Sequence, residues 1–246
     1  MFYYVGLDLG QSQDYTALAV LETQLWTGSL VDWADFGVFF PDGIEPGGWV
    51  SPSAVGPLYA ERILAVNAAY RVGPLAGDVP VAVRHLQRFE LGTKYTDIVR
   101  AVHRLLSREP FRRRLLYTRL LVDRTGVGAS VVDSFFERGV RPISVTIHGG
   151  SAVTWEPADL SYRVPKRDLV AAVQVLLQNG RLKIAPELEL APVLKKELLN
   201  FRVKIDPRTA HDSYEHWREG DHDDLVLATA LACWFSEYVR KWEAVA

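Results

Sequence analysis

Acidic residues at three places in the chain, two single aspartates and one adjacent pair, have side chains and surroundings that suit chemistry at a metal ion. Asp8 interrupts the apolar run "GLDLG", Asp123 ends the apolar run "LLVD", and Asp223 and Asp224 precede the apolar run "LVLATALACWF". An ionised carboxylate in apolar surroundings is costly unless it is paired, hydrogen-bonded or bound to a cation. Each of these positions therefore requires a partner.

A divalent cation could be the shared partner of all these carboxylates. Carboxylates that lie close together repel one another, and a cation between them relieves that repulsion. Mg²⁺ and Mn²⁺ prefer oxygen ligands, and two such ions ~3.5–4 Å apart can clamp the attacking and leaving oxygens of a phosphodiester. We predict Asp8, Asp123 and Asp224 as ligands, with Asp223 in support, although the apolar periodicity of the last helix does not choose between Asp223 and Asp224.

Each aspartate also has a purely structural interpretation. Asp8 would cap the glycine turn that follows it, and Asp123 would stabilise the start of the next helix. Asp223 or Asp224 would cap the last helix, where the macrodipole favours acidic residues. One position alone decides nothing, whereas the combination favours the metal site.

Strand and helix patterns alternate along the segments that must position these residues. Strands are predicted over residues 2–9, 16–22, 79–91, 117–123 and 141–147. Helices are predicted over residues 95–107, with Thr96 as its cap, and over 129–139, 165–180, 189–201 and 221–242. This order predicts an α/β fold with a mixed five-stranded sheet, an antiparallel hairpin followed by parallel strands, flanked by helices. Sites in such sheets form at the carboxyl ends of parallel strands, where Asp8 and Asp123 stand.

One segment departs from this alternation. Residues 23–78 are rich in proline and glycine and are predicted to form an insertion with a short helix over 58–70. We expect a single domain over residues 1–246 that carries this insertion. A length of 246 residues with 48% apolar and 24% charged residues is ordinary for a globular protein.

Composition also limits compartment and partners. No run approaches the ~20 apolar residues that span a bilayer, and no signal-type segment opens the chain, so we expect a cytoplasmic protein without a membrane partner. Cys233 is the only cysteine, which rules out an internal disulfide and a cysteine zinc cluster, and we interpret it as a buried hydrophobe. The net charge of −2 excludes a uniformly basic surface. Arginines nevertheless gather in residues 103–119, which on their own indicate a solvated surface but leave room for a local nucleic-acid site.

Several segments, in order, resemble one known family. They are "GLDLGQSQDYTALAV", "LLVDRTGVGASVVDSFFERG", "RVPKRDLVAAVQVLLQNGRLKIA", "LLNFRVKI" and "HDDLVLATALACW". They resemble the nuclease domain of bacteriophage large terminase subunits, which has a ribonuclease-H-like fold, and the resemblance covers nearly the whole chain apart from residues 23–78. It implies a metal-dependent endonuclease that cuts concatemeric double-stranded viral DNA during genome packaging, with two Mg²⁺ or Mn²⁺ ions.

The resemblance also implies roles for individual residues. It assigns the catalytic ligands to Asp8, Asp123, Asp224 and, in support, Asp223, with one ion activating water and the other stabilising the departing 3′-oxygen, which leaves 5′-phosphate and 3′-hydroxyl ends. Lys166 and Arg167 match the "PKR" helix start of the family and would contact DNA phosphates. Asp14 matches a family position and has either a turn role or a role at the site edge. His222 would orient a water or carboxylate, or act as a local cap.

One expected part of a large terminase has no counterpart in this sequence. Packaging ATPases carry a GxxxxGKS or GxxxxGKT phosphate loop, and "LGTK" lacks the upstream glycine, so no motor activity is assigned. The expected partners are double-stranded DNA and a separate packaging ATPase, portal or small terminase. The location would be the host cytoplasm if the chain is viral or prophage-derived.

Three other functions fit part of the pattern. "GLDLGQS" and "VDRTGVG" resemble the phosphate loops of actin-like ATPases and sugar kinases, but such proteins generally need two domains of this kind, and they leave Asp223 and Asp224 unexplained. A non-catalytic DNA-binding module would make the acidic positions structural. Holliday-junction-resolving nucleases share the fold and stay open as an alternative.

Overall fold

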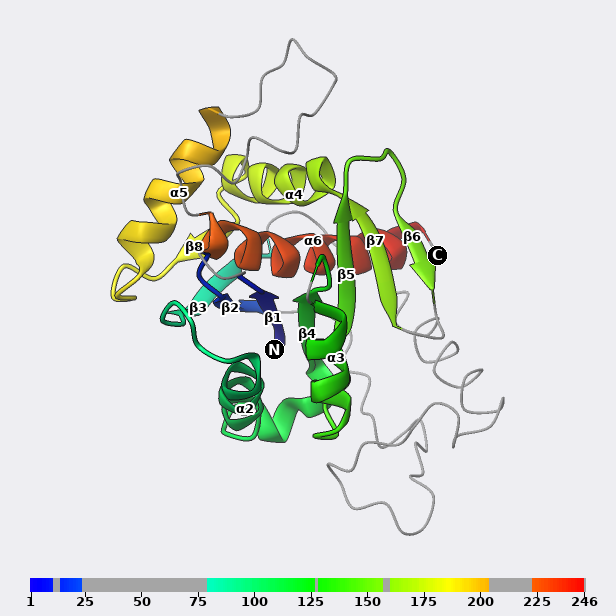
Figure 1. Ribbon diagram of the computed structural model, residues 1–246. Helices are drawn as coiled ribbons and strands as arrows, with labels where there is room; N and C mark the ends of the chain where they lie inside the picture. Colours follow the sequence, from blue (N-terminus) through cyan, green and yellow to red (C-terminus); the bar gives the residue numbers. More distant parts are fainter. Residues whose placement is uncertain (11–13, 24–78, 127, 157–159, 204–222, 246) are drawn as a thin grey trace, which may run out of the picture.

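The computed structural model describes residues 1–10, 14–23, 79–126, 128–156, 160–203 and 223–245. A mixed sheet of eight strands lies at its centre, in the order β6-β7-β5-β4-β1-β2-β3-β8 (Figure 1). The strands are β1 (Phe2–Asp8), β2 (Ala17–Thr23), β3 (Val81–Arg88), β4 (Thr118–Asp123), β5 (Ile143–His148), β6 (Thr154–Glu156), β7 (Ser161–Pro165) and β8 (Leu182–Ile184). The helices are α2 (Tyr95–Leu106), α3 (Gly128–Phe136), α4 (Lys166–Gln178), α5 (Ala191–Val203) and α6 (Asp224–Val245), with a 3₁₀ segment η2 (Arg112–Tyr117).

The predicted α/β class is confirmed, and so is the predicted order of an antiparallel hairpin followed by parallel strands. β1 and β2 form the antiparallel hairpin, and β1, β4, β5 and β7 pair in parallel. β3 is antiparallel to β2, so it runs in the direction of β1. The sheet has eight strands rather than five, because β6, β7 and β8 are only three to five residues long and too short to give a periodic signal.

The cap of α2 and the start of α6 differ from the prediction. α2 begins at Tyr95 with Lys94 as its N-cap and no side-chain cap, so Thr96 lies inside the first turn instead of capping it. α6 begins at Asp224 rather than at residue 221. Residues 24–78, which hold nearly all of the predicted insertion, lie outside the described residues, so the insertion and the single-domain organisation stay predictions.

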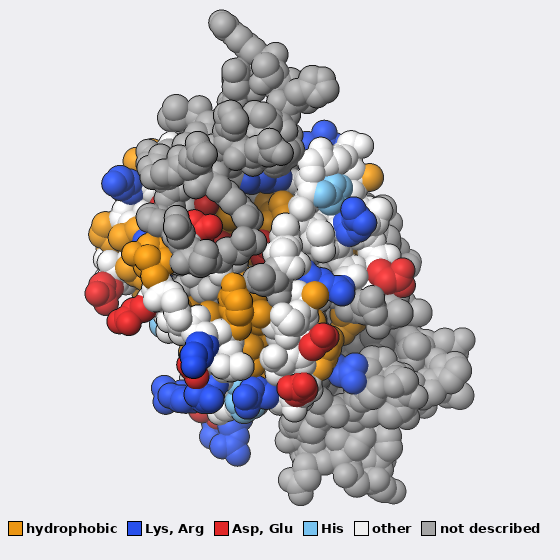
Figure 2. Space-filling view, viewed as in Figure 1, with side chains coloured by type: hydrophobic (Ala, Val, Ile, Leu, Met, Phe, Trp, Pro, Cys, Tyr) orange, Lys and Arg blue, Asp and Glu red, His pale blue; other side chains and the backbone are white. Residues whose placement is uncertain are grey.

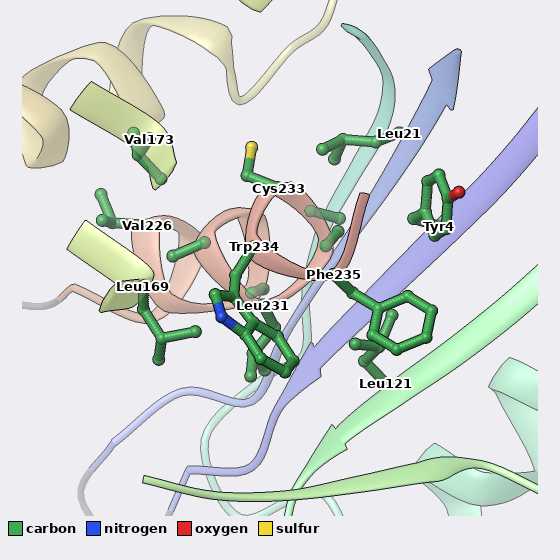
Figure 3. Packing of buried hydrophobic residues seen from close by; sticks show 14 of the residues in the cluster. Tyr4, Leu21, Leu121, Leu169, Val173, Val226, Leu231, Cys233, Trp234 and Phe235 are labelled. Atoms are coloured by element: carbon green, nitrogen blue, oxygen red, sulfur yellow. The ribbon is translucent and has the colours of Figure 1, made fainter. Parts of the chain in front are cut away.

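Helices cover the two faces of the sheet with separate apolar cores. α4, α5 and α6 pack on one face, and α2 and α3 pack on the other. In Figure 3, Trp234 and Phe235 of α6 lie among Tyr4, Leu121 and other residues of the first core. Cys233 is fully buried there, which confirms its interpretation as a core residue.

Alternation along β1 decides which side chains reach each face. Tyr3, Val5 and Leu7 belong to the core under α2 and α3, whereas Tyr4 belongs to the core under α6. Gly6 shares the α6 face, and a Cβ atom added to it would lie 1.9 Å from the carbonyl oxygen of Ala228. The helix backbone therefore rests directly on β1. No helix within the described residues is long and apolar enough to cross a bilayer.

Candidate metal centre

Asp8 and Asp123 end neighbouring parallel strands at the same level. The register of β1 and β4 places Leu7 opposite Val122, so the next step places Asp8 beside Asp123. Adjacent strands lie about 4.8 Å apart, and side chains at one level of a parallel pair share a face. That face is the one under α6, because Leu121 belongs to the core there. Both aspartates are buried, at 6% and 7% exposure.

The same row of the sheet continues to an arginine. Asp8 pairs with Ala17 of β2, and Ala17 pairs with Arg88 at the end of β3. Asp123, Asp8, Ala17 and Arg88 thus follow one another across four strands at one edge of the sheet. The short side chain of Ala17 separates the acidic pair from the arginine.

The start of α6 lies over this edge. Asp224 is the first residue of the helix, one turn before the contact between Ala228 and Gly6. The backbone N–H of Leu227 donates to the carbonyl of Asp223 at 2.9 Å, which makes Asp223 the N-cap residue. Asp224 is buried, at 4% exposure, whereas Asp223 is half-buried. The fold therefore brings the predicted residues of β1, β4 and α6 to one edge and distinguishes the two helix-start aspartates by burial.

Arg88 connects Asp224 with a residue that the sequence analysis missed. Its guanidinium lies 3.3 Å from Oδ2 of Asp224 and also forms an ion pair with Glu197 of α5. The same guanidinium stacks over the ring of Tyr15, 4.7 Å from its centre. Oε2 of Glu197 accepts a hydrogen bond from the backbone N–H of Val226 at 3.1 Å. β3, α5 and the start of α6 are thus joined by one buried polar network.

Burial changes the acidity of Glu197. Loss of solvent raises its pKa to about 7, against the opposing effects of Arg88 and the Val226 N–H, and the charge of Asp224 adds to the rise. The raised pKa of Glu197 therefore reflects its burial first, and the nearby Asp224 carboxylate contributes less. The sequence carried one signal for Glu197, since it follows the buried Leu194 by three residues and so shares an apolar helix face.

Asp123 is held by the turn that follows it. Its Oδ1 accepts a hydrogen bond from the backbone N–H of Thr125 at 2.7 Å. The hydroxyl of Thr125 accepts from the N–H of Ile147 on the neighbouring β5, at 3.1 Å. A Cβ atom added to Gly128 would lie 2.3 Å from the carbonyl oxygen of Asp123, so α3 starts close against the strand end. The hydrogen bond from Thr125 fixes the orientation of Asp123 against the turn that precedes α3, and a role of Asp123 at the helix start stays a prediction.

Gly10 closes the turn after β1. Its N–H donates to the hydroxyl of Thr16 at 3.1 Å, and its carbonyl accepts from the hydroxyl of Tyr95 at 2.8 Å. A Cβ atom at Gly10 would lie 2.2 Å from the carbonyl oxygen of Asp14, so a glycine is needed where the chain returns on itself. Asp14 is half-buried beside this contact, and residues 11–13 lie outside the described residues. Its role at the site edge stays a prediction.

The basic pair predicted at the start of α4 lies beyond the carboxyl ends of the parallel strands. β7 ends at Pro165, opposite His148 at the end of β5, and α4 begins with Lys166. Lys166 is half-buried and Arg167 is exposed. The guanidinium of Arg167 donates to the carbonyl of Ser151 at 2.7 Å. Their predicted phosphate contacts are not tested by this arrangement, and His222 lies outside the described residues.

The donor set at this edge fits a hard divalent cation. Asp8, Asp123 and Asp224 offer carboxylate oxygens, which are the ligands that Mg²⁺ and Mn²⁺ prefer. Within the described residues, however, no three Asp, Glu, His or Cys side chains converge closely enough to hold an ion as they stand. The Asp224 carboxylate pairs with Arg88. Joint binding of an ion by the three carboxylates would require side-chain movement.

No family model and no curated protein sequence matches this chain. Several solved structures match this chain, and the three described here align with it along most of its length. The large terminase nuclease from thermophilic phage G20c aligns with a TM-score of 0.48 and 16% identity, covering 94% of this chain and 80% of that one. RuvC from Thermus thermophilus aligns with a TM-score of 0.37 and 13% identity, covering 97% and 96%. The manganese-soaked terminase nuclease domain of human cytomegalovirus aligns with a TM-score of 0.39 and 12% identity, covering 98% and 87%.

Proposed function

We propose that this chain is a metal-dependent endonuclease that hydrolyses phosphodiester bonds of double-stranded DNA. One observation carries the proposal. Asp8 and Asp123 end adjacent parallel strands at one level and on one face, and the buried Asp224 begins the helix that crosses the same edge. The order of the motifs around these residues, which resembles that of terminase nucleases, supports the same assignment.

The proposal gives each residue at the edge a task. Asp8, Asp123 and Asp224 hold Mg²⁺ or Mn²⁺, and Asp223 supports Asp224 from the N-cap position. Two divalent ions bound there would supply the charge that activates a water and stabilises the departing 3′-oxygen. Arg88 pairs with Asp224, and Glu197 binds both Arg88 and the N–H of Val226, so the two residues hold the start of α6 in place. Lys166 and Arg167 contact the DNA backbone, so binding carries little sequence preference.

The finer assignment follows the resemblance. We propose that the chain cuts concatemeric viral DNA as terminase nucleases do, in the cytoplasm of a host cell and together with a separate packaging ATPase, portal or small terminase. The cut would leave 5′-phosphate and 3′-hydroxyl ends, which DNA ligase can rejoin.

Incubation of supercoiled plasmid with Mg²⁺ or Mn²⁺ tests the proposal. The parent chain should nick and linearise the plasmid, and Asp8→Asn, Asp123→Asn and Asp224→Asn should each lose this activity while they keep the circular dichroism of the fold. Asp133→Asn is the matched control, because Asp133 is exposed on α3. Its activity should equal that of the parent.

Two further substrates separate the alternatives. A four-way junction cut in strong preference to linear duplex would replace the terminase-like assignment by a junction-resolving one. If the plasmid stays intact with both metals and the chain hydrolyses ATP, the assignment becomes that of an actin-like ATPase or kinase. Equal cutting by the parent and the three aspartate variants would refute the site.

A further inference from the structure

A row of arginines runs along the side of α2 that faces away from the sheet. Arg100 and Arg104 lie on the helix, and Arg108 and Arg112 continue the four-residue spacing beyond it. The N–H of Arg112 donates to the carbonyl of Arg108 at 3.0 Å, so a turn after α2 brings the backbones of these two residues together. All four residues are exposed, and Figure 2 shows Lys and Arg side chains gathered over the α2 region. We call these four residues the arginine stripe.

The stripe has a large excess of positive charge. Residues 97–114 contain six arginines and only two acidic residues, Asp97 and Glu109, in a chain whose net charge is −2. Arg100 pairs with Asp97 at 2.7 Å, and Arg113 pairs with Glu109 at 3.1 Å. Among the described residues, no carboxylate lies within 4 Å of Arg104, Arg108 or Arg112. Three neighbouring guanidinium groups are therefore directed to solvent without an acidic counterpart.

The position of the stripe relates it to the candidate metal centre. The hydroxyl of Tyr95, at the start of α2, donates to the carbonyl of Gly10, two residues after Asp8. Beyond the other end of α2, the ring of Phe111 packs edge-on against Tyr3, 5.1 Å between centres. The stripe thus extends from near the carboxyl edge of the sheet along the length of β1 toward its start.

The chemistry of the stripe suits a linear polyanion. A guanidinium group can bind a phosphate through two parallel hydrogen bonds, and it keeps its charge at any physiological pH. Four residues of helix advance about 6 Å, so Arg100 and Arg104 of α2 present charges at that spacing, and the turn after the helix adds Arg108 and Arg112. A repeated row of exposed cations matches the closely spaced charges of a DNA backbone better than it matches a single small ligand.

We propose that the arginine stripe binds the phosphate backbone of duplex DNA at a distance from the cut, so that the duplex lies along α2 as it leaves the metal centre. This inference rests on the proposed function. It assigns the stripe to affinity rather than to chemistry, since phosphate contacts of this kind position the duplex without reading its sequence.

Fluorescence anisotropy of a labelled short duplex in EDTA, measured at several salt concentrations, tests the inference apart from cutting. Arg104→Gln/Arg108→Gln should weaken binding on the order of tenfold at 0.1 M salt and should flatten the slope of log affinity against log salt by about 0.9 for each phosphate that is no longer neutralised. Arg84→Gln/Lys183→Gln is the matched control, because it removes the same charge from exposed positions on β3 and β8. The control should bind as the parent does.

The outcomes separate this inference from the proposed endonuclease. If the stripe variant and the parent bind the duplex with equal affinity and equal salt slope, the DNA-binding role of the arginine stripe is refuted, even if the parent cuts plasmid. If the parent binds DNA through the stripe but cuts no DNA, the DNA-binding role of the stripe is supported and the endonuclease activity is refuted. Arg104→Lys/Arg108→Lys should recover most of the affinity, which would exclude misfolding as the cause of the weaker binding. Stripe-dependent binding of a polyglutamate chain but not of DNA would overturn the inference in favour of an acidic protein partner.

Discussion

The guanidinium of Arg88, at the end of β3, lies 3.3 Å from the carboxylate of Asp224, at the start of α6. The same guanidinium pairs with Glu197 on α5, so one cation compensates two buried carboxylates from two other elements. A buried carboxylate that lost its partner would be strongly unfavourable. The ion pair with Arg88 therefore offsets part of the cost of burying the Asp224 carboxylate at this edge of the sheet.

Replacement of Arg88 tests this network. Arg88→Gln should lower the free energy of unfolding by roughly 3–5 kcal/mol, because it removes the cation that pairs with both buried carboxylates, Asp224 and Glu197. Arg84→Gln is the control, since Arg84 lies on the same strand and pairs with Glu22 at 3.2 Å, but its side chain is 55% exposed against 18% for Arg88. Arg84→Gln should lower the free energy of unfolding by less than about 1 kcal/mol. Urea denaturation in EDTA measures both, and similar losses in the two variants would argue against the network.

Glu197 should make stability depend on pH. Burial raises its pKa in the folded chain from 4.5 to about 7, so the folded state binds the proton more tightly than the unfolded state does. The resulting stabilisation is complete below pH 4.5 and is lost as the pH rises through 7. Relative to Glu197→Gln, the parent should therefore lose stability between these values. Denaturation at a series of pH values in EDTA checks this, and a constant difference between the two chains would contradict it.

Gly6 should be required for the close packing of α6 against the sheet. A Cβ atom there would lie 1.9 Å from the carbonyl oxygen of Ala228, so Gly6→Ala must displace a helix backbone. We expect a loss of about 3 kcal/mol, at the upper end of overpacking costs, together with weaker metal-dependent cutting because Asp224 moves with the helix.

Gly92→Ala is the control for Gly6→Ala. Gly92 has a φ of 78° and open space around it. Its replacement by alanine should therefore lower the free energy of unfolding only by the cost of a left-handed backbone at a residue with a Cβ atom, about 1–2 kcal/mol. Cutting should be retained in this variant. Thermal denaturation and the plasmid assay compare the two, and a Gly6→Ala chain as stable and active as the parent would show that α6 does not need this close approach.

Local patterns in the sequence carry the fold class and part of the site. The apolar runs that end at Asp8 and Asp123 predict strands with acidic carboxyl ends, and parallel pairing then follows from the alternation of strands and helices. The apolar run after Asp224 predicts the helix that covers them. These three residues could be proposed together because each closes or opens a regular element.

The remaining features of the site and of the sheet depend on contacts between residues that are far apart in the sequence. The pair of Arg88 and Glu197 joins residues 109 positions apart, and it forms only when α5 and α6 pack beside the end of β3. No local period reports such a contact. The short strands β7 and β8 likewise exist because the sheet offers them a partner, since three to five residues form no strand by their own propensity.

Binding of Mn²⁺ tests the central claim most directly, because it requires neither a DNA substrate nor a partner protein. Electron paramagnetic resonance of free Mn²⁺, titrated into the parent chain, Asp8→Asn, Asp123→Asn and Asp133→Asn, reports the fraction of bound ion. The parent and Asp133→Asn should bind Mn²⁺ with equal affinity, and Asp8→Asn and Asp123→Asn should each bind it at least about tenfold more weakly. Equal binding of Mn²⁺ by all four chains, or no binding by the parent, would contradict a metal centre at this edge of the sheet.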